Sequence, residues 1–177
     1  NNTLVAYNKR GELLWTYSIE KGQAFKNYKL SRDGKYAVMG VSEEGSRRFF
    51  SLKSHFILLR DGNEKWRKSS KGEAGDIAIS PNNAYIILTS RSRYNTYVII
   101  YTIDGAELWN SVVKGTPTYL VDAPDNVNIS PDGRFFAVSA KDESEGICHI
   151  YFFENRDLLI RGVKEKLLRE IDELIKR

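Results

Sequence analysis

The sequence predicts an all-β protein made of repeated four-stranded antiparallel sheets, with one amphipathic α-helix at its C-terminal end. Two short phrases recur along the chain, and self-similarity at a period of roughly 40 to 50 residues is typical of repeat architectures. The segments between the phrases are short and rich in β-branched and aromatic residues, as strands are. The turn phrase occupies residues 31–36, 80–85 and 130–135, and a Gly-x-x-x-Trp phrase occupies residues 11–15, 62–66 and 105–109.

The first predicted elements are two strands joined by a turn over residues 8–11. They look like the last two strands of an earlier sheet, because the Trp15 phrase falls on the second of them. A complete unit follows, and its fourth strand begins after the Asp61-Gly62 turn and carries Trp66. The predicted strands are 4–7 and 13–19 for the leading pair, and 25–30, 36–41 and 56–59 for the first three strands of the unit.

The second complete unit shows the four-strand plan most clearly. Residues 81–83 supply a tight turn between its first two strands, and Asp104-Gly105 joins its last two. An Asp-Gly pair is a strong hairpin signal because both residues tolerate a positive φ. Trp109 anchors the fourth strand. The predicted strands are 75–80, 84–90, 96–103 and 107–113.

The third unit is shorter and ends where the periodicity of the sequence changes. Its strands are predicted at 127–130, 135–139 and 147–153. We therefore expect two parts, with sheets over residues 1–158 and a helix over residues 159–177.

The turn at 130–135 (Ser-Pro-Asp-Gly before an aromatic residue) and the Asp-Gly-x-x-Leu-Trp phrase at 104–109 resemble WD-repeat-like and quinoprotein-like β-propeller blades. The resemblance covers roughly residues 3–158 and implies a β-propeller fold. It implies no particular activity, because propellers host enzymes, scaffolds and receptors alike. The Trp-Asp and Gly-His pairs of WD repeats and the full quinoprotein docking pattern are absent, so no quinone-binding residue carries over.

The strand count implies an incomplete propeller. The predicted strands make about three and a half blades, whereas closed propellers typically have about four to eight. An unclosed propeller exposes apolar sheet faces and unpaired strand edges that something must cover. We expect either that the chain is the C-terminal part of a longer propeller, whose earlier blades lie outside it or in another chain, or that two copies complete one ring. Both alternatives predict a partner surface.

From residue 160 onward, apolar residues recur at spacings of three and four, which predicts an amphipathic helix. A helix of about 15 residues is marginal alone in water, so its apolar stripe needs a partner face. Two alternatives stay open: the helix packs on the rim of its own propeller, or it docks on another subunit. The predicted partner-helix face consists of Ile160, Val163, Leu167, Ile171 and Leu174.

The loops between second and third strands lie on one rim of the predicted propeller, and two adjacent loops are rich in arginine. A planar guanidinium suits bidentate binding of carboxylate or phosphate, and an aromatic ring stacks on planar ligands. We predict an anionic ligand or an acidic partner here; the alternative is an ordinary solvated surface. The candidate residues are Arg47, Arg48, Arg91, Arg93 and Tyr94.

Several residues that often carry chemistry are better explained by structure. Asp33, Asp61, Asp104 and Asp132 stand in turns, where such residues bond their own backbone. The three tryptophans fall at one equivalent strand position and are predicted to pack between blades.

The chain has few residues for metal or nucleophile chemistry. One cysteine and two histidines exclude an internal disulfide framework and leave little for a zinc site. Cys148 and His149 are neighbours in a predicted strand, so they point to opposite faces and form no nucleophile pair. Asp122 and Asp125 are a weak calcium signal without further oxygen ligands. We predict no metal and no cofactor.

The net charge of +4 resides in the basic first 75 residues, whereas the remainder is slightly acidic. Without a nucleic-acid-binding motif, the sequence argues against DNA or RNA as partners. No apolar run approaches the roughly 20 residues of a membrane span. The leading hypothesis is a non-catalytic propeller segment that acts as a protein-interaction module or subunit of an assembly. The alternative is the C-terminal part of a propeller enzyme, a quinoprotein-like oxidoreductase or a hydrolase, whose catalytic residues lie outside this chain.

Overall fold

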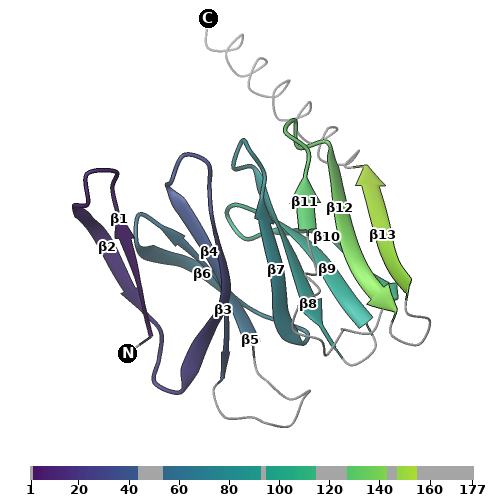
Figure 1. The fold of residues 1–177 in the computed structure, drawn as a ribbon, viewed down its shortest axis with the longest axis horizontal. Helices are drawn as coiled ribbons and strands as arrows, with labels where there is room; N and C mark the ends of the chain where they lie inside the picture. The colour runs from purple at the N-terminus through teal and green to yellow at the C-terminus, as the bar shows by residue number, and fades with distance from the viewer. Residues whose placement is uncertain (1, 44–53, 93–94, 115–126, 143–146, 155–177) are drawn as a thin grey trace, which may run out of the picture.

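The computed structural model describes residues 2–43, 54–92, 95–114, 127–142 and 147–154. Within these ranges the chain forms thirteen strands and no helix, which confirms the predicted all-β class (Figure 1). The predicted helix over residues 159–177 lies outside the described residues, so its partner-helix face stays a prediction.

The strands form four antiparallel sheets in chain order, named here sheet 1 to sheet 4. Sheet 1 has two strands, sheets 2 and 3 have four each, and sheet 4 has three, as predicted. Sheet 1 contains β1 (Thr3–Tyr7) and β2 (Leu13–Ser18); sheet 2 contains β3 (Gln23–Leu30), β4 (Tyr36–Glu43), β5 (Ser54–Arg60) and β6 (Asn63–Ser69). Sheet 3 contains β7 (Glu73–Ile79), β8 (Tyr85–Arg91), β9 (Asn95–Thr102) and β10 (Glu107–Lys114); sheet 4 contains β11 (Val127–Ile129), β12 (Phe135–Asp142) and β13 (Ile147–Glu154).

The turn phrase folds the same way in each sheet because its serine side chain, and the aspartate or asparagine side chain two residues later, bond the backbone. In sheet 2 the Ser31 hydroxyl accepts a hydrogen bond from the Tyr36 amide at 2.9 Å, and Asp33 Oδ1 accepts one from the Lys35 amide at 3.1 Å. The fourth residue, Gly34, has a φ of +73°, which glycine adopts without strain. The corresponding bonds recur in the turns of sheets 3 and 4. The repeat in the sequence is therefore a repeat in hydrogen bonding.

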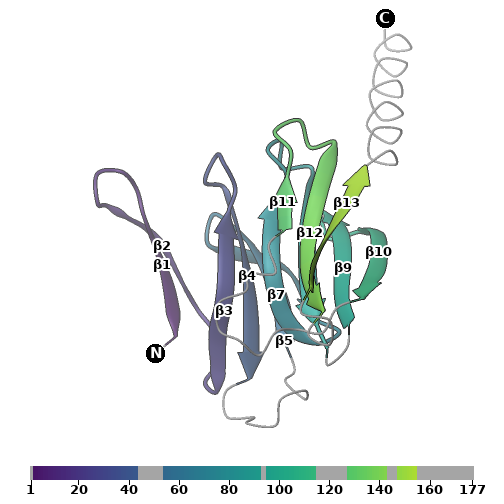
Figure 2. The ribbon, with the colours of Figure 1, turned by 45° about the vertical axis from the view of Figure 1, so that its right-hand side comes forward.

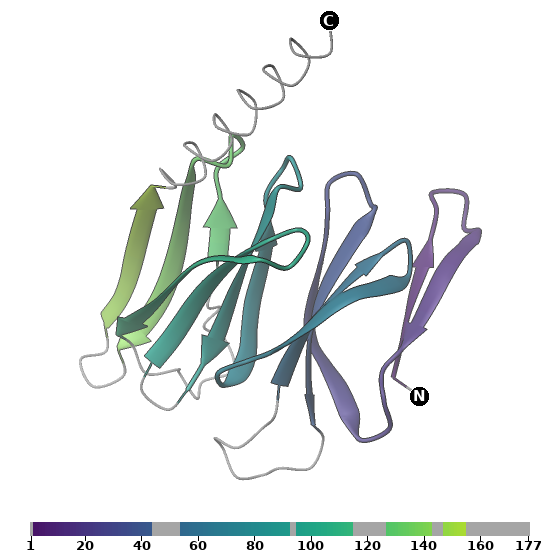
Figure 3. The same cartoon turned by 180° about the vertical axis from the view of Figure 1, so that it is seen from behind.

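The four sheets stand side by side in chain order (Figures 1 and 2). The first strands of successive sheets are in contact, β3 with β7 and β7 with β11. The reverse view shows the same order from sheet 1 to sheet 4 (Figure 3). This is the radial stacking that the repeat predicts, because each sheet contacts only its neighbours.

A buried apolar layer fills each junction between neighbouring sheets. Met39 lies in the junction of sheets 1 and 2, Leu58 and Leu88 in that of sheets 2 and 3, and Ile100 and Val138 in that of sheets 3 and 4. Successive residues of a strand point to opposite faces, so one strand contributes to two junctions. Burying one such aliphatic side chain stabilises the fold by about 1.5–3 kcal/mol. Stability therefore comes from the junctions between sheets.

Candidate functional site

The candidate site consists of the two end faces of the array, which become apparent when equivalent positions are compared between sheets. Leu58, Ile100 and Phe152 are equivalent, because each pairs with the third residue of the strand before it. Leu58 and Ile100 are 0% and 3% exposed, whereas Phe152 is 75% exposed. Phe152 thus occupies a position that carries a buried apolar side chain in the two complete sheets.

The next position on the same face repeats this contrast. Phe56, Val98 and Ile150 each pair with the fifth residue of the preceding strand. The first two are buried, whereas Ile150 is 69% exposed. We call the surface that contains Ile150 and Phe152 the C-terminal end face. It has the sequence of an inter-sheet face and lacks a neighbouring sheet among the described residues.

Sheet 1 shows the same contrast on the face that points away from sheet 2. In each of sheets 1, 2 and 3, one strand residue pairs in register with the tryptophan of the neighbouring strand. Val5, Ile57 and Ile99 each come directly before that residue, so the three positions are equivalent. Val5 is 39% exposed, whereas Ile57 and Ile99 are buried. Further exposed apolar side chains of sheet 1 are Tyr7, Leu13 and Leu14. We call the surface that contains Val5 and Tyr7 the N-terminal end face.

The exposure of a residue on β3, the inner strand of sheet 2, reflects the absence of inner strands from sheet 1 among the described residues. Tyr28 on β3 is equivalent to Ile77 on β7, because they pair with Met39 and Leu88 at the same register. Tyr28 is 62% exposed and Ile77 only 2%. Ile77 is covered by the inner strands of sheet 2, whereas sheet 1 has only its two outer strands among the described residues. The exposure of Tyr28 follows from that difference.

Tryptophans close the inner junctions, as the sequence predicts. Trp15 of sheet 1 lies against Gly62 of sheet 2, and Trp66 of sheet 2 lies against Gly105 of sheet 3. The Trp66 indole also donates a hydrogen bond from Nε1 to the carbonyl oxygen of Ile103 at 3.0 Å. Each indole therefore lies on the hairpin turn of the following sheet.

The third tryptophan also packs against the sheet that follows its own. Trp109 of sheet 3 packs edge-on against two phenylalanines of sheet 4, with ring centroids 6.1 Å from Phe136 and 5.4 Å from Phe153. The predicted role of all three tryptophans in packing between blades is confirmed.

A polar cluster joins sheets 1 and 2 at their outer strands. The Tyr17 hydroxyl donates a hydrogen bond to Glu64, and Arg67 forms an ion pair with Glu64 at 3.2 Å. Burial and the bond to Glu64 raise the pKa of Tyr17 to about 12. The hydrogen bonds from Arg67 hold the pKa of Glu64 below its ordinary value. The cluster links two sheets, and it has the character of a junction rather than of a reactive centre.

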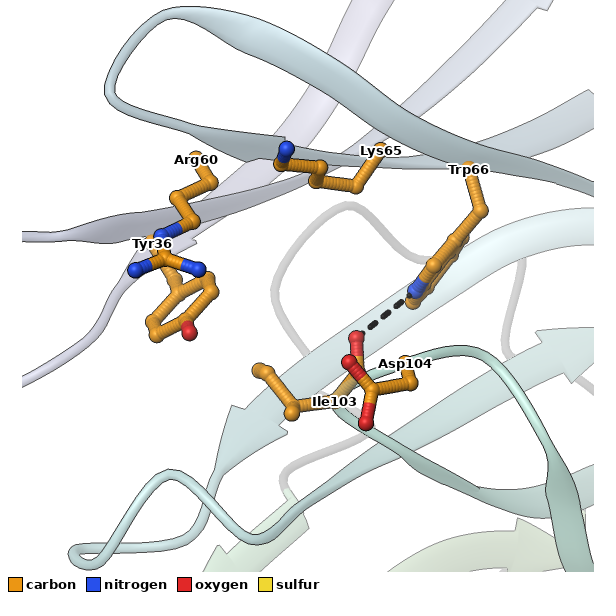
Figure 4. A pocket seen from close by; sticks show the side chains of 6 residues that line it. All are labelled: Tyr36, Arg60, Lys65, Trp66, Ile103 and Asp104. Carbon is orange, nitrogen blue, oxygen red and sulfur yellow. Dashed lines mark hydrogen bonds between the residues drawn. The ribbon is translucent and has the colours of Figure 1, made fainter.

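A pocket of about 210 Å³ lies where the turns of sheets 2 and 3 meet (Figure 4). Its charged side chains are exposed, and they mix two cations with a carboxylate. The Arg60 guanidinium stands 5.8 Å from the centre of the Tyr36 ring. The lining has no set of buried polar groups that converge on one point, so it favours packing between turns over binding of a ligand. The lining residues are Tyr36, Arg60, Lys65, Trp66, Ile103 and Asp104.

Of the predicted arginine rim, only Arg91 falls among the described residues. It is the last residue of β8, and its backbone pairs in register with that of Glu73; the Glu73 carboxylate forms an ion pair with Lys26 at 3.2 Å. The described part of this rim is therefore mixed in charge. Arg47, Arg48, Arg93 and Tyr94 lie outside the described residues, and the anionic site stays a prediction.

The turn aspartates behave as predicted where their bonds are described. Hydrogen bonds from Ser31 and from the Lys35 amide lower the pKa of Asp33, and those from Ser130 and the Arg134 amide lower the pKa of Asp132. Asp61 and Asp104 also stand in turns.

The remaining candidates bring no reactive group together. Cys148 is exposed, and the ring of His149 lies 6.1 Å from that of Tyr151. Asp122 and Asp125 lie outside the described residues. The described ranges contain no group of three or more His, Cys, Asp or Glu side chains placed to hold a metal ion. The same ranges also contain no helix of the length and apolarity that a membrane span requires.

Sequence reasoning predicted uncovered faces but did not identify the residues that form them. The turn phrases alone do not align these positions, because the connection between the second and third strands differs in length from unit to unit; the strand register places Phe152 with Leu58 and Ile100. At the N-terminal end a sequence signal was available, because aligning the tryptophan phrases places Val5 with Ile99.

Comparisons with known proteins support the fold. No protein-family model matches the chain. A curated 6-phosphogluconolactonase of Formosa agariphila is 24% identical over 123 residues, which make up 68% of this chain and 34% of that protein. The chain thus spans about a third of the length of this relative.

Two solved structures resemble the array of sheets. A putative dipeptidyl aminopeptidase IV from Bacteroides ovatus matches with a TM-score of 0.58 at 12% identity, over 85% of this chain and 29% of that one. The Dos1 propeller matches with a TM-score of 0.51 at 10% identity, over 88% of this chain and 50% of that one. At such identities the likeness concerns the fold alone. Together with the radially stacked antiparallel sheets, it shows that the chain consists of β-propeller blades.

Proposed function

We propose that this chain is a run of consecutive propeller blades that acts as a non-catalytic interaction module, with further blades covering both of its end faces. The covering blades belong to the rest of a longer chain or to another chain. One observation carries the proposal: Phe152 and Ile150 are exposed at positions that are buried in both complete sheets.

The physical reason lies in the apolar surface at the two ends. Burial of apolar surface is worth about 25 cal/mol per Å². Isolated exposed apolar residues are ordinary, but here they recur at the register positions that hold neighbouring sheets together. A further four-stranded blade matches these faces because each inner junction already joins two such faces.

Sedimentation velocity of the isolated chain at several concentrations tests the proposal. We expect self-association, together with binding of a hydrophobic dye, and we expect Phe152→Lys to weaken both. Val112→Lys is a matched control, because Val112 is an exposed apolar residue on a sheet that has both neighbours. A monomer that stays soluble at high concentration and binds no dye would rule the proposal out.

A second candidate function is that of a propeller enzyme, and the 24% identity to a 6-phosphogluconolactonase favours it. In that case these blades form part of a hydrolase for sugar lactones. The test is hydrolysis of 6-phosphogluconolactone by the complete protein, measured against spontaneous hydrolysis. A rate no higher than the spontaneous one would dismiss this candidate and leave the interaction module standing.

A further inference from the structure

The turn at Gly11 repeats a feature that both complete sheets use to receive a neighbour. Gly62 and Gly105 have φ values of +80° and +90° and stand four residues before a tryptophan. A Cβ atom added at Gly62 would lie 2.6 Å from Cβ of Trp15. One added at Gly105 would lie 2.8 Å from Cδ1 of Trp66. Each glycine thus leaves room for the indole of the preceding sheet.

Gly11 has the same backbone conformation but a different environment. Its φ is +80°, and it stands four residues before Trp15. Apart from Gly11 itself and its two chain neighbours, no heavy atom of the described residues lies within 4 Å of the place where a Cβ would stand. The Gly11 turn therefore has the same backbone shape as the turns at Gly62 and Gly105. It lies on the side of the array where no preceding sheet is described.

We infer that the Gly11 turn receives a tryptophan from the outer strand of a preceding blade, and that this blade is not supplied by a second copy of this chain. The inference rests on the proposed function and names the chemistry of the partner at the N-terminal end face. The covering blade presents an indole to Gly11 and apolar side chains to Val5 and Tyr7.

The number of tryptophans supports the claim that the covering blade does not come from a second copy of this chain. The chain has three tryptophans, and each already packs against the following sheet of its own chain. A second copy has the same three in the same places, so it has none left for Gly11. The indole therefore comes from a blade with a different sequence.

An extended chain tests the inference with a probe of known sequence. A second copy of residues 23–94 is placed before Asn2, which supplies one complete sheet bearing a tryptophan and two inner strands that complete sheet 1. In this extended chain we expect Gly11→Ala to lower the urea midpoint by about 0.5 M more than it does in the original chain. Replacing the tryptophan of the added sheet by leucine should abolish that difference.

Gly22→Ala is the matched control, since Gly22 has a φ of +84° and also has no described atom within 4 Å of an added Cβ. Its effect should be equal in the original and extended chains. If the extension suppresses self-association while Gly11→Ala and Gly22→Ala behave alike, the indole inference fails and the proposed function stands. If the extension leaves self-association unchanged, the proposed function fails as well.

A second measurement does not depend on folding of the extension. The original chain is titrated with N-acetyl-L-tryptophanamide while the amide resonances of Gly11 and Gly22 are followed. We expect a concentration-dependent shift for Gly11 alone, and none with N-acetyl-L-leucinamide. Equal shifts at both glycines, or none at Gly11, would overturn the inference. So would a discrete dimer of the original chain that Gly11→Ala dissociates and Gly22→Ala does not.

Discussion

Sheets 3 and 4 carry similar side chains at the same register positions and differ in what covers them. Ile100 of sheet 3 is buried because sheet 4 stands beside it, whereas Phe152 of sheet 4 is exposed. The larger side chain is the one in contact with water. In this fold, burial is thus set by the neighbouring sheet rather than by the strand itself. The proposal that a further blade covers the C-terminal end face rests on this comparison.

The largest expected effect comes from truncating equivalent side chains on the two kinds of face. Leu58→Ala should lower the free energy of unfolding by about 2–5 kcal/mol, because it opens a cavity in a packed junction. Phe152→Ala should change it by less than about 0.5 kcal/mol, as surface substitutions do. Urea denaturation of both variants measures the difference. Equal losses would mean that Phe152 is already covered in the isolated chain.

A smaller effect is expected at the tryptophan of an inner junction. Trp66→Phe removes the hydrogen bond to the Ile103 carbonyl and should lower the free energy of unfolding by about 1 kcal/mol. Tyr28→Phe is the control, because Tyr28 is exposed and should show no comparable loss. Thermal denaturation of the two variants provides the comparison. An unchanged transition in Trp66→Phe would show that the indole does not hold the junction.

The junction of sheets 1 and 2 should lose stability in alkaline solution. The pKa of Tyr17 is raised to about 12 in the folded chain, above its ordinary value of 10.0. Between these two values the unfolded chain loses the proton and the folded chain keeps it, so stability falls as the pH rises. Tyr17→Phe should remove this part of the pH dependence of unfolding. A profile that is identical in both proteins would contradict the raised pKa of the half-buried Tyr17 hydroxyl.

The smallest effect is expected at the exposed turns. The pKa of Asp132 is lowered by its bonds to Ser130 and the Arg134 amide, so the stability that these bonds contribute is lost as the pH falls below the ordinary range of aspartate. Asp132→Ala should flatten the acid limb of the stability profile slightly and leave neutral stability nearly unchanged. A large loss at neutral pH would mean that this turn does more than close a hairpin.

Much of the fold was predictable because its signals are local. The positive φ of Gly34, the Ser31 and Asp33 bonds and the Trp66 position all follow from residue types at fixed spacing. The strand ends of sheet 3 agree with the predicted ranges within one or two residues.

The end faces were harder to predict, because exposure depends on a neighbour that the local sequence does not encode. Nothing in the residues around Phe152 distinguishes it from Ile100, and both are apolar residues of a third strand. The predicted arginine rim combined loops by their place in the topology, and of its residues only Arg91 falls among those that the structure describes. Propensity predicts strands well, whereas coverage of a sheet face is a tertiary property.

The thiol of Cys148 provides the most direct test, because it is the only cysteine and lies on β13 two residues before Ile150. Alternation along the strand places both on the C-terminal end face. In the isolated chain, at concentrations low enough to keep it monomeric, the thiol should react rapidly with a maleimide. In the complete protein or assembly it should react at least about tenfold more slowly, while an exposed cysteine introduced by Arg32→Cys in a Cys148→Ser background keeps its rate. Equal rates for Cys148 in both forms would show that no blade covers this face and would contradict the account.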